Sequence, residues 1–168
     1  MRAMDLLVEL FKHNTMMNER LLEACRPLSP EQLGTTVEGT YGSIGATLAH
    51  IAGAQEGYAA RLLDVERPER FDEEPFPGFD VVGSHFANGN AMLEAAAASG
   101  WKDREIEVTG DDPPGTFRVP VGLMLLQAIN HGTEHRSQIA TILTHLGIAP
   151  PEMDGWTYFF DAGYMKPV

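Results

Sequence analysis

Cysteine and basic residues are both scarce in this chain. The single cysteine, Cys25, cannot form an internal disulfide, so a disulfide scaffold is excluded and an oxidising compartment is not indicated. The 12 basic residues stand against 24 acidic ones, which gives a formal net charge of −12. Nucleic acids and anionic membrane surfaces both attract clustered Lys and Arg, so we expect neither as a partner.

Long apolar runs are also missing. No uninterrupted run approaches the roughly 20 apolar residues that a membrane-spanning helix needs. Near the N-terminus, Asp5 and Glu9 interrupt the stretch that would otherwise be compared with a secretory signal. We therefore expect a cytoplasmic protein. With 168 residues, 43% of them hydrophobic, the chain is expected to fold as a single domain over residues 1–168.

Several well-known catalytic motifs are absent. The serine-hydrolase motif G-x-S-x-G fails around Ser43, because Tyr41 replaces its first glycine. The metalloprotease motif H-E-x-x-H fails because Gly132 follows His131. The chain also lacks the glycine patterns of P-loop and Rossmann nucleotide sites and the paired cysteines of structural zinc sites. These reaction and cofactor classes are set aside.

The sequence does contain four segments with the apolar periodicity of amphipathic helices. They cover residues 2–26, 43–65, 80–99 and 120–147, and Ser43 and Asp80 are the expected N-caps of the second and third.

The connections between these helices are distinctive. The proline-rich and acidic stretch 66–79 is long enough to cross the bundle from one end to the other. Alternating charged and apolar residues in 104–119, interrupted by the turn sequence DDPPG, predict a β-hairpin. An aromatic tail follows the last helix, with Asp154 as an expected cap. The fold class is therefore all-α: a four-helix bundle with a small β-hairpin between helices three and four.

The fourth predicted helix carries two histidines, His131 and His135, four residues apart. Residues at this spacing lie one above the other on the same helix face. Met124 and Ile142 fall within roughly 20° of His131 around the helix, so the pair faces or borders the protein interior. Two imidazoles buried there need a compensating partner, and a shared metal ion is one that both can bind.

A third histidine, His50, lies at the border of the apolar stripe in the second helix. Alone it reads as a structural histidine, but with the pair it could complete a three-histidine site. Imidazole ligands suit zinc, nickel, copper or iron, and three of them leave a position for water or substrate. The residues on its own face are small and would leave space beside it: Ser43, Ala46, Thr47, Ala54 and Gly57.

The remaining polar candidates have ordinary interpretations. His13 is expected to be solvent-facing or to cap a helix, His85 to be exposed, and His145 to interact with the negative end of the helix dipole. Glu134 could orient a ligand, and Arg136 and Gln138 could line a pocket, although solvent-exposed or bundle-edge positions are favoured for all three. The positions of these polar candidates are: His13, His85, Glu134, Arg136, Gln138, His145.

Three segments resemble the DinB/YfiT-like superfamily. Residues 128–154, AINHGTEHRSQIATILTHLGIAPPEMD, resemble its last bundle helix, with an N-H-x-x-x-H-R-x-Q core. Residues 47–63, TLAHIAGAQEGYAARLL, resemble its second helix, and residues 11–25 are a weaker match to its first, with His13 and Met16 where aromatics are usual.

This resemblance implies a bundle with up-down-down-up helix order that is often a homodimer. It also implies a divalent metal ion held by His50, His131 and His135. Zinc or nickel would be the first choice of metal, with iron, manganese or copper as alternatives. Some members use a low-molecular-weight thiol as co-substrate, and others are described as metal-dependent hydrolases.

The functional prediction is a metal-dependent enzyme that acts on a small molecule. Thiol-dependent S-transfer or isomerisation is the more specific version, since a divalent cation stabilises the thiolate that no protein cysteine here provides. Hydrolysis by activated water is the rival version, and no residue is assigned as general acid or base. The alternative is a non-enzymatic metal-binding or stress-associated bundle, which would lack an open coordination position and an adjacent pocket.

Overall fold

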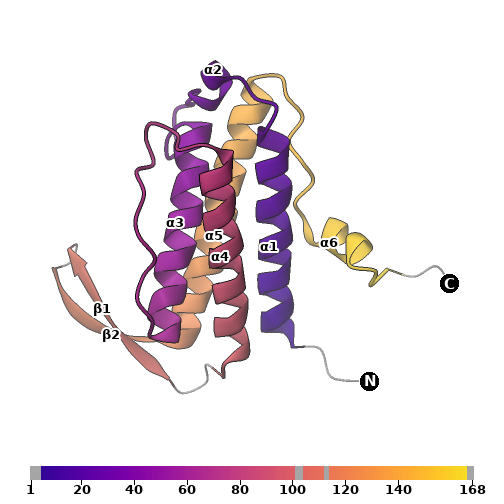
Figure 1. The fold of residues 1–168 in the computed structure, drawn as a ribbon. Helices are drawn as coiled ribbons and strands as arrows, with labels where there is room; N and C mark the ends of the chain where they lie inside the picture. The colour runs from indigo at the N-terminus through magenta and orange to yellow at the C-terminus, as the bar shows by residue number, and fades with distance from the viewer. Residues whose placement is uncertain (1–4, 101–103, 112–113, 166–168) are drawn as a thin grey trace.

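The computed structural model describes residues 5–100, 104–111 and 114–165 and has the predicted fold, a four-helix bundle with a β-hairpin (Figure 1). The long helices are α1 (Leu6–Cys25), α3 (Ile44–Leu63), α4 (Phe79–Ala98) and α5 (Val121–His145). The shorter elements are α2 (Pro30–Leu33), β1 (Glu105–Asp111), β2 (Pro114–Pro120) and α6 (Gly155–Asp161). No helix in these described ranges is long and apolar enough to cross a membrane.

The four long helices have the predicted up-down-down-up order. In Figure 1, α1 runs upward, α3 and α4 both run downward, and α5 returns upward. Parallel neighbours require a long connection, and residues 64–78 supply it by crossing from the lower end of α3 to the upper end of α4. In the bundle, α4 packs against α3 and α1, and α5 packs against the other sides of α3 and α1.

Several helices begin directly after a residue whose side chain caps the free backbone N–H groups of the first turn. The Ser43 side chain accepts a hydrogen bond from the Ala46 backbone and caps α3 as predicted. α1 begins at Leu6 behind the cap Asp5, later than the predicted start at residue 2. The prediction that Asp80 caps α4 is wrong. Gly78 is the N-cap, at φ +100° with no side-chain hydrogen bond, and Asp80 lies in the first turn.

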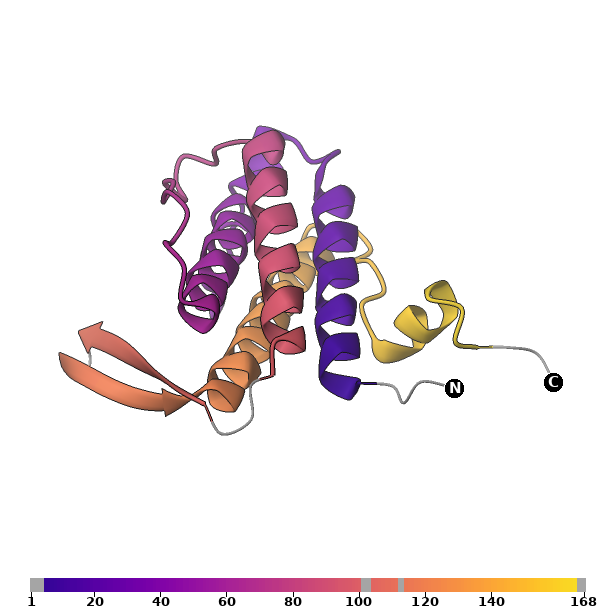
Figure 2. The ribbon, with the colours of Figure 1, turned by 60° about the horizontal axis from the view of Figure 1, so that its bottom comes forward.

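The hairpin lies outside the bundle. β1 and β2 pair antiparallel with Ile106 opposite Val119, as the alternating pattern predicts, and the tip of the turn includes residues outside the described ranges. Figure 2 shows the hairpin projecting from the end of the bundle where α3 ends and α5 begins, away from α6. Its partly buried side chains Ile106, Val108 and Val119 still pack against the apolar core at this end of the bundle.

The tail after α5 returns along α1. Asp154 accepts a hydrogen bond from the Thr157 backbone and caps α6, as predicted, and the Tyr158 hydroxyl donates to Glu9 of α1 at 2.6 Å. The ring of His13 lies edge-on to Tyr158, with 5.5 Å between ring centroids. His13 is therefore half-buried, and its prediction as a solvent-facing or capping residue is wrong.

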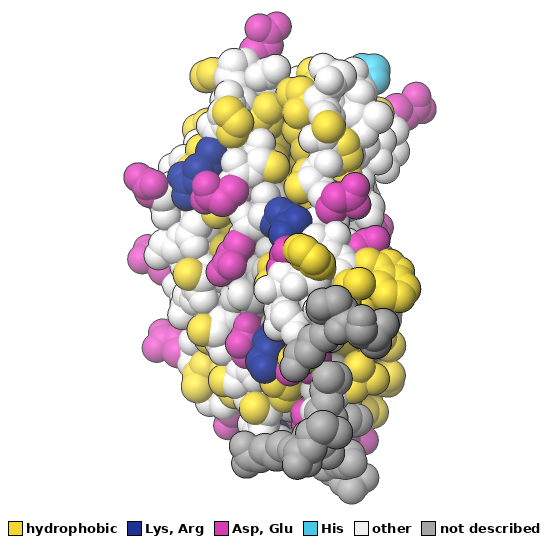
Figure 3. Space-filling view, turned by 90° about the vertical axis from the view of Figure 1, so that its right-hand side faces the viewer, with side chains coloured by type: hydrophobic (Ala, Val, Ile, Leu, Met, Phe, Trp, Pro, Cys, Tyr) yellow, Lys and Arg dark blue, Asp and Glu magenta, His cyan; other side chains and the backbone are white. Residues whose placement is uncertain are grey.

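Much of α6 remains uncovered. Figure 3 views the side of the molecule on which α6 lies and shows apolar side chains gathered among acidic ones. Trp156 is 68% exposed and Phe160 is 72% exposed. The predicted homodimer, which would offer such side chains a partner surface, stays a prediction.

The core consists of two apolar clusters with a polar layer between them. Each of the four long helices contributes apolar side chains to both clusters, for example Phe11 to one and Leu21 to the other from α1. The polar layer lies between these positions and consists of buried side chains from all four long helices: Asn14, Asn18, Gln55, Asn90 and Arg136.

Arg136 connects this layer. Its Nη1 donates to Asn14 Oδ1 at 2.6 Å and to Asn18 Oδ1 at 2.7 Å, while both asparagines donate to Gln55 Oε1. Burial lowers the pKa of Arg136 to about 10, so it remains a cation at neutral pH. Predicting Arg136 at a pocket, in solvent or at the bundle edge is wrong. Gly132 makes the space, because a Cβ there would lie 3.0 Å from Arg136 Nη1.

Candidate metal centre

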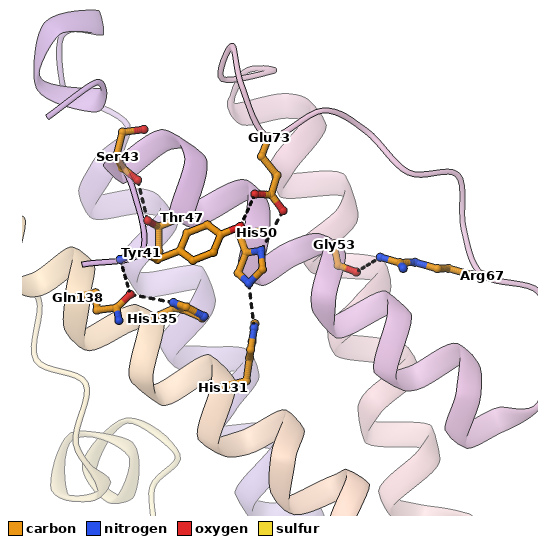
Figure 4. Close-up of polar contacts among 10 residues, drawn as sticks. All are labelled: Tyr41, Ser43, Thr47, His50, Gly53, Arg67, Glu73, His131, His135 and Gln138. Atoms are coloured by element: carbon orange, nitrogen blue, oxygen red, sulfur yellow. Dashed lines mark hydrogen bonds and ion pairs between the residues drawn. The ribbon is translucent and has the colours of Figure 1, made fainter. Parts of the chain in front are cut away.

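Three histidines converge between α3 and α5 (Figure 4). His50 comes from the second turn of α3, and His131 and His135 come from successive turns of α5. Each ring offers one nitrogen to a group in which all three nitrogens lie within 4.8 Å of one another. His135 is buried and the other two are half-buried. The structure therefore brings together the three residues that the sequence singled out.

Hydrogen bonds fix the orientation of two of these rings. His50 Nδ1 donates to Glu73 Oε1 at 2.9 Å, and His135 Nδ1 donates to Gln138 Oε1 at 2.8 Å. Both acceptors are oxygens without a proton to give, so Nδ1 carries the hydrogen in each case. In the neutral form of each ring the lone pair is therefore on Nε2. Outer hydrogen bonds of this kind accompany metal-binding histidines.

His131 has a different environment. Its Nε2 lies 3.0 Å from His50 Nε2, and its Nδ1 is buried without a hydrogen-bond partner among the described residues. Burial, followed by the neighbouring His135 and His50, lowers the pKa of His131 to about 4. His131 is therefore neutral at physiological pH, the form in which an imidazole binds a metal ion.

Two loops complete the surroundings of the histidines. The ring of Tyr41, in the 34–42 loop, stacks on His50 at 4.0 Å between centroids. Its hydroxyl donates to Glu73 Oε2 at 2.8 Å, and its backbone N–H donates to Gln138 Oε1 at 3.1 Å. Burial and the Glu73 carboxylate raise the pKa of Tyr41 to about 12, so it stays protonated and keeps this bond.

The donor set fits a divalent cation. A zinc–imidazole bond is about 2.0–2.1 Å long, so two ligand nitrogens on one ion lie roughly 3.0–3.4 Å apart. The observed 3.0 Å between His50 Nε2 and His131 Nε2 matches this separation. His135 offers a third lone pair close by, with its other nitrogen already satisfied by Gln138. The cluster thus fits a three-histidine metal-binding site.

A cavity of about 710 Å³ opens beside the cluster. His50 and His131 form part of its lining, and so do four small residues of α3: Ala49, Gly53, Ala54 and Gly57. Small side chains near His50 do leave space, as predicted, although of the predicted set Ser43, Ala46 and Thr47 are not in this lining. A cavity of this size is typical of small-molecule sites.

The other histidines lie apart from the cluster. His145 lies in the last turn of α5, as predicted, and it is exposed. The prediction of an exposed His85 is wrong, because its Nδ1 donates to the buried Glu56 at 2.7 Å. Glu134 is exposed, which confirms its ordinary interpretation. Gln138 is half-buried and contacts His135, so of these candidates it is the one that belongs to the site.

Two residues of the site were missed by sequence reasoning. Glu73 lies in the 66–79 stretch with four other acidic residues, and nothing in their order distinguishes it. Tyr41 was considered only as the residue that breaks a serine-hydrolase motif. The available signal was its position two residues before the cap Ser43. Ser43 in turn precedes His50 by seven residues, which is about two helical turns.

Comparisons with known proteins bear on the family and the fold. The model of the DinB family matches residues 1–164. A solved structure described as a DinB-like protein from Bacillus cereus ATCC 10987 is similar with a TM-score of 0.67 and 19% sequence identity. The match covers 87% of this chain and 94% of that one, and it bears on the fold. No curated protein matches the chain.

Proposed function

Because the chain belongs to the DinB family, we propose that it is a metal-dependent enzyme acting on a small molecule, with His50, His131 and His135 as ligands of a divalent cation. The orientation of His50 by Glu73 and of His135 by Gln138 supports this assignment. Zinc or nickel is our first choice of metal, because both accept neutral imidazoles, with iron, manganese or copper as alternatives.

One observation carries the enzymatic part of the proposal. The cavity of about 710 Å³ includes His50 and His131 in its wall, so the ligand group has a side that a small molecule can reach. A bundle whose histidines served only stability would need no such opening. The cavity therefore favours an enzyme over the alternative, a non-enzymatic metal-binding or structural bundle.

The chemistry we propose is activation of an oxygen or sulfur nucleophile. A divalent cation lowers the pKa of bound water and stabilises a thiolate. The protein's own residues orient the histidines: Glu73 holds His50, and Tyr41 holds Glu73 through its protonated hydroxyl. Cys25 is fully buried and its pKa is raised to about 12, so it supplies no nucleophile. A low-molecular-weight thiol is thus our specific proposal for the co-substrate, and hydrolysis is the second candidate.

A turnover assay tests the thiol proposal. We expect the zinc- or nickel-loaded protein to consume a low-molecular-weight thiol in the presence of a chromogenic aryl halide, at a rate at least about tenfold above that of His131→Ala, since a stabilised thiolate is the reactive form. The measurement is loss of free thiol with time. Metal-loaded protein that hydrolyses a model ester but leaves thiol unconsumed would support hydrolysis instead. Metal-loaded protein inactive in both assays across a panel of thiols and esters would favour the non-enzymatic alternative.

A further inference from the structure

The wall of the cavity next to the histidines contains three arginines: Arg61, Arg67 and Arg70. The whole chain has only 12 basic residues against 24 acidic ones, and three of the basic ones line this single cavity, together with four carboxylates. Arg61 comes from the last turn of α3, and the other two come from the crossover loop. Figure 4 shows Arg67 reaching back to α3 just beyond His50.

These arginines have no carboxylate partner within ion-pair distance in the part of the chain that the structure describes. Instead, Arg67 Nη2 donates to the Gly53 carbonyl at 3.0 Å and Arg61 Nη1 donates to the Gly57 carbonyl at 3.0 Å. A guanidinium has five N–H donors, so most remain available. Burial, and then the charges of Arg70 and Arg61, lower the pKa of Arg67, while the charge of Glu56 raises it.

The carboxylates of the same cavity form no ion pair with these arginines among the described residues. Glu56 accepts hydrogen bonds from His85 and Asn88, both at 2.7 Å. Glu73 is engaged by His50 and Tyr41. The two remaining acids in the wall, Glu69 and Asp72, are exposed and make no ion pair with the arginines among the described residues. Cations gathered without a partner raise the affinity of a site for anions.

We propose that this cavity binds an anionic group, a carboxylate or a phosphate, of the substrate, with Arg67 as the central contact. The Arg67 guanidinium lies against Gly53 and Gly57, three and seven residues beyond His50, which are about 4.5 Å and about 10.5 Å further along the helix axis. The anionic group is therefore held about one to two helical turns beyond His50 along α3. The substrate class is a small organic acid or phosphate whose reacting atom lies at that separation from its anionic group.

The position of Arg67 depends on a glycine. A Cβ added at Gly57 would lie 3.1 Å from the Arg67 guanidinium carbon, so any larger residue would displace the guanidinium. Gly53 and Gly57 thus give Arg67 a place against α3 that leaves its other donors free. That the bound substrate also contacts a metal ion rests on the proposed function. Binding of the anionic group itself rests on the arginines alone.

The test is a titration of the full-length chain with inorganic phosphate in one series and malonate in the other. The readout is the set of arginine Nε–Hε NMR signals, recorded for zinc-loaded protein and for protein from which metal and chelator have been removed by dialysis. We expect saturable shifts in both forms for at least one anion, and the tighter of the two identifies the class. In Arg67→Gln we expect binding at least about tenfold weaker, because a hydrogen bond to a charged group is lost. Arg67→Lys should retain part of the affinity.

Arg118→Gln is the matched control, since Arg118 is an exposed arginine on β2, and it should bind like the wild-type chain. Equal affinity in the wild-type chain and Arg67→Gln, or no saturable binding, would overturn the inference. Binding that disappears with the metal but survives Arg67→Gln would overturn it too, while supporting the metal centre. Binding that needs Arg67 but not the metal would support the inference even if the metal proposal failed.

Discussion

Replacing Glu73 with glutamine is expected to weaken metal binding by about 10- to 100-fold, the range typical of residues that orient metal ligands. The Glu73 carboxylate accepts the Nδ1 proton of His50 at 2.9 Å, which keeps the His50 lone pair on Nε2. A neutral amide accepts this proton more weakly and can also turn its NH₂ group toward the ring. The measurement is competition with a chromogenic chelator, which gives the dissociation constants of both proteins for zinc.

Glu69→Gln is the control for this prediction. Glu69 lies on the same loop and lines the same cavity, but it is exposed and contacts no histidine in the described structure. It changes the net charge as Glu73→Gln does, so a general electrostatic effect would weaken both variants equally. Equal weakening of the two, or unchanged affinity in Glu73→Gln, would contradict the role assigned to Glu73.

Replacing Arg136 with alanine is expected to lower the free energy of unfolding by about 3–5 kcal/mol. The change removes two short hydrogen bonds and leaves the side-chain oxygens of Asn14 and Asn18 without a donor in the middle of the bundle. Each unsatisfied buried group costs about 1–3 kcal/mol, and the lost volume leaves a cavity that adds to the cost. Urea unfolding of metal-free protein at pH 7 gives the difference.

Two further variants serve as an intermediate case and as a control for this prediction. Arg136→Lys keeps the charge but not the planar fork, so it should fall between the wild-type chain and Arg136→Ala. Arg118→Ala, at an exposed position, should change stability by no more than about 0.5 kcal/mol. If Arg136→Ala also changed the free energy of unfolding by no more than about 0.5 kcal/mol, the polar layer would contribute little to the stability of the fold.

The main helices could be predicted because their information is local. The spacing of apolar residues in α1, α3 and α5 records which face is buried, and Ser43 and Asp154 satisfy backbone donors within three residues of themselves. The same local logic placed His50, His131 and His135 on inward-facing or bordering positions. Asp80 shows the limit of prediction from local sequence. It is a residue suited to capping, yet the N-cap of α4 is a glycine at positive φ two positions earlier.

The misassigned residues depend on contacts between distant segments. Arg136 lies about 140° around its helix from His131, which reads as a solvent-facing position for a helix buried on one side. In the bundle α5 packs against both α1 and α3, so the buried arc is wide enough to include it. Glu73 and Tyr41 lie in loops, where no periodicity reports which side chain turns toward the site.

The polar layer and the metal centre share one helix. Arg136 follows His135 directly, and Gly132, which makes space for the Arg136 guanidinium, follows His131 directly. The face of α5 that presents the imidazoles and the face bound to α1 are thus fixed by adjacent residues. The contacts of Arg136 with α1 therefore fix the orientation of α5 about its own axis, and with it the direction in which both histidines point.

The most direct test of the central claim is the metal content of the purified chain beside the double variant His131→Ala/His135→Ala. Elemental analysis should find close to one divalent ion per wild-type chain and almost none in the variant, with circular dichroism showing helices in both. The same negligible metal in both proteins after incubation with zinc and with nickel would contradict the claim, as would equal stoichiometric binding.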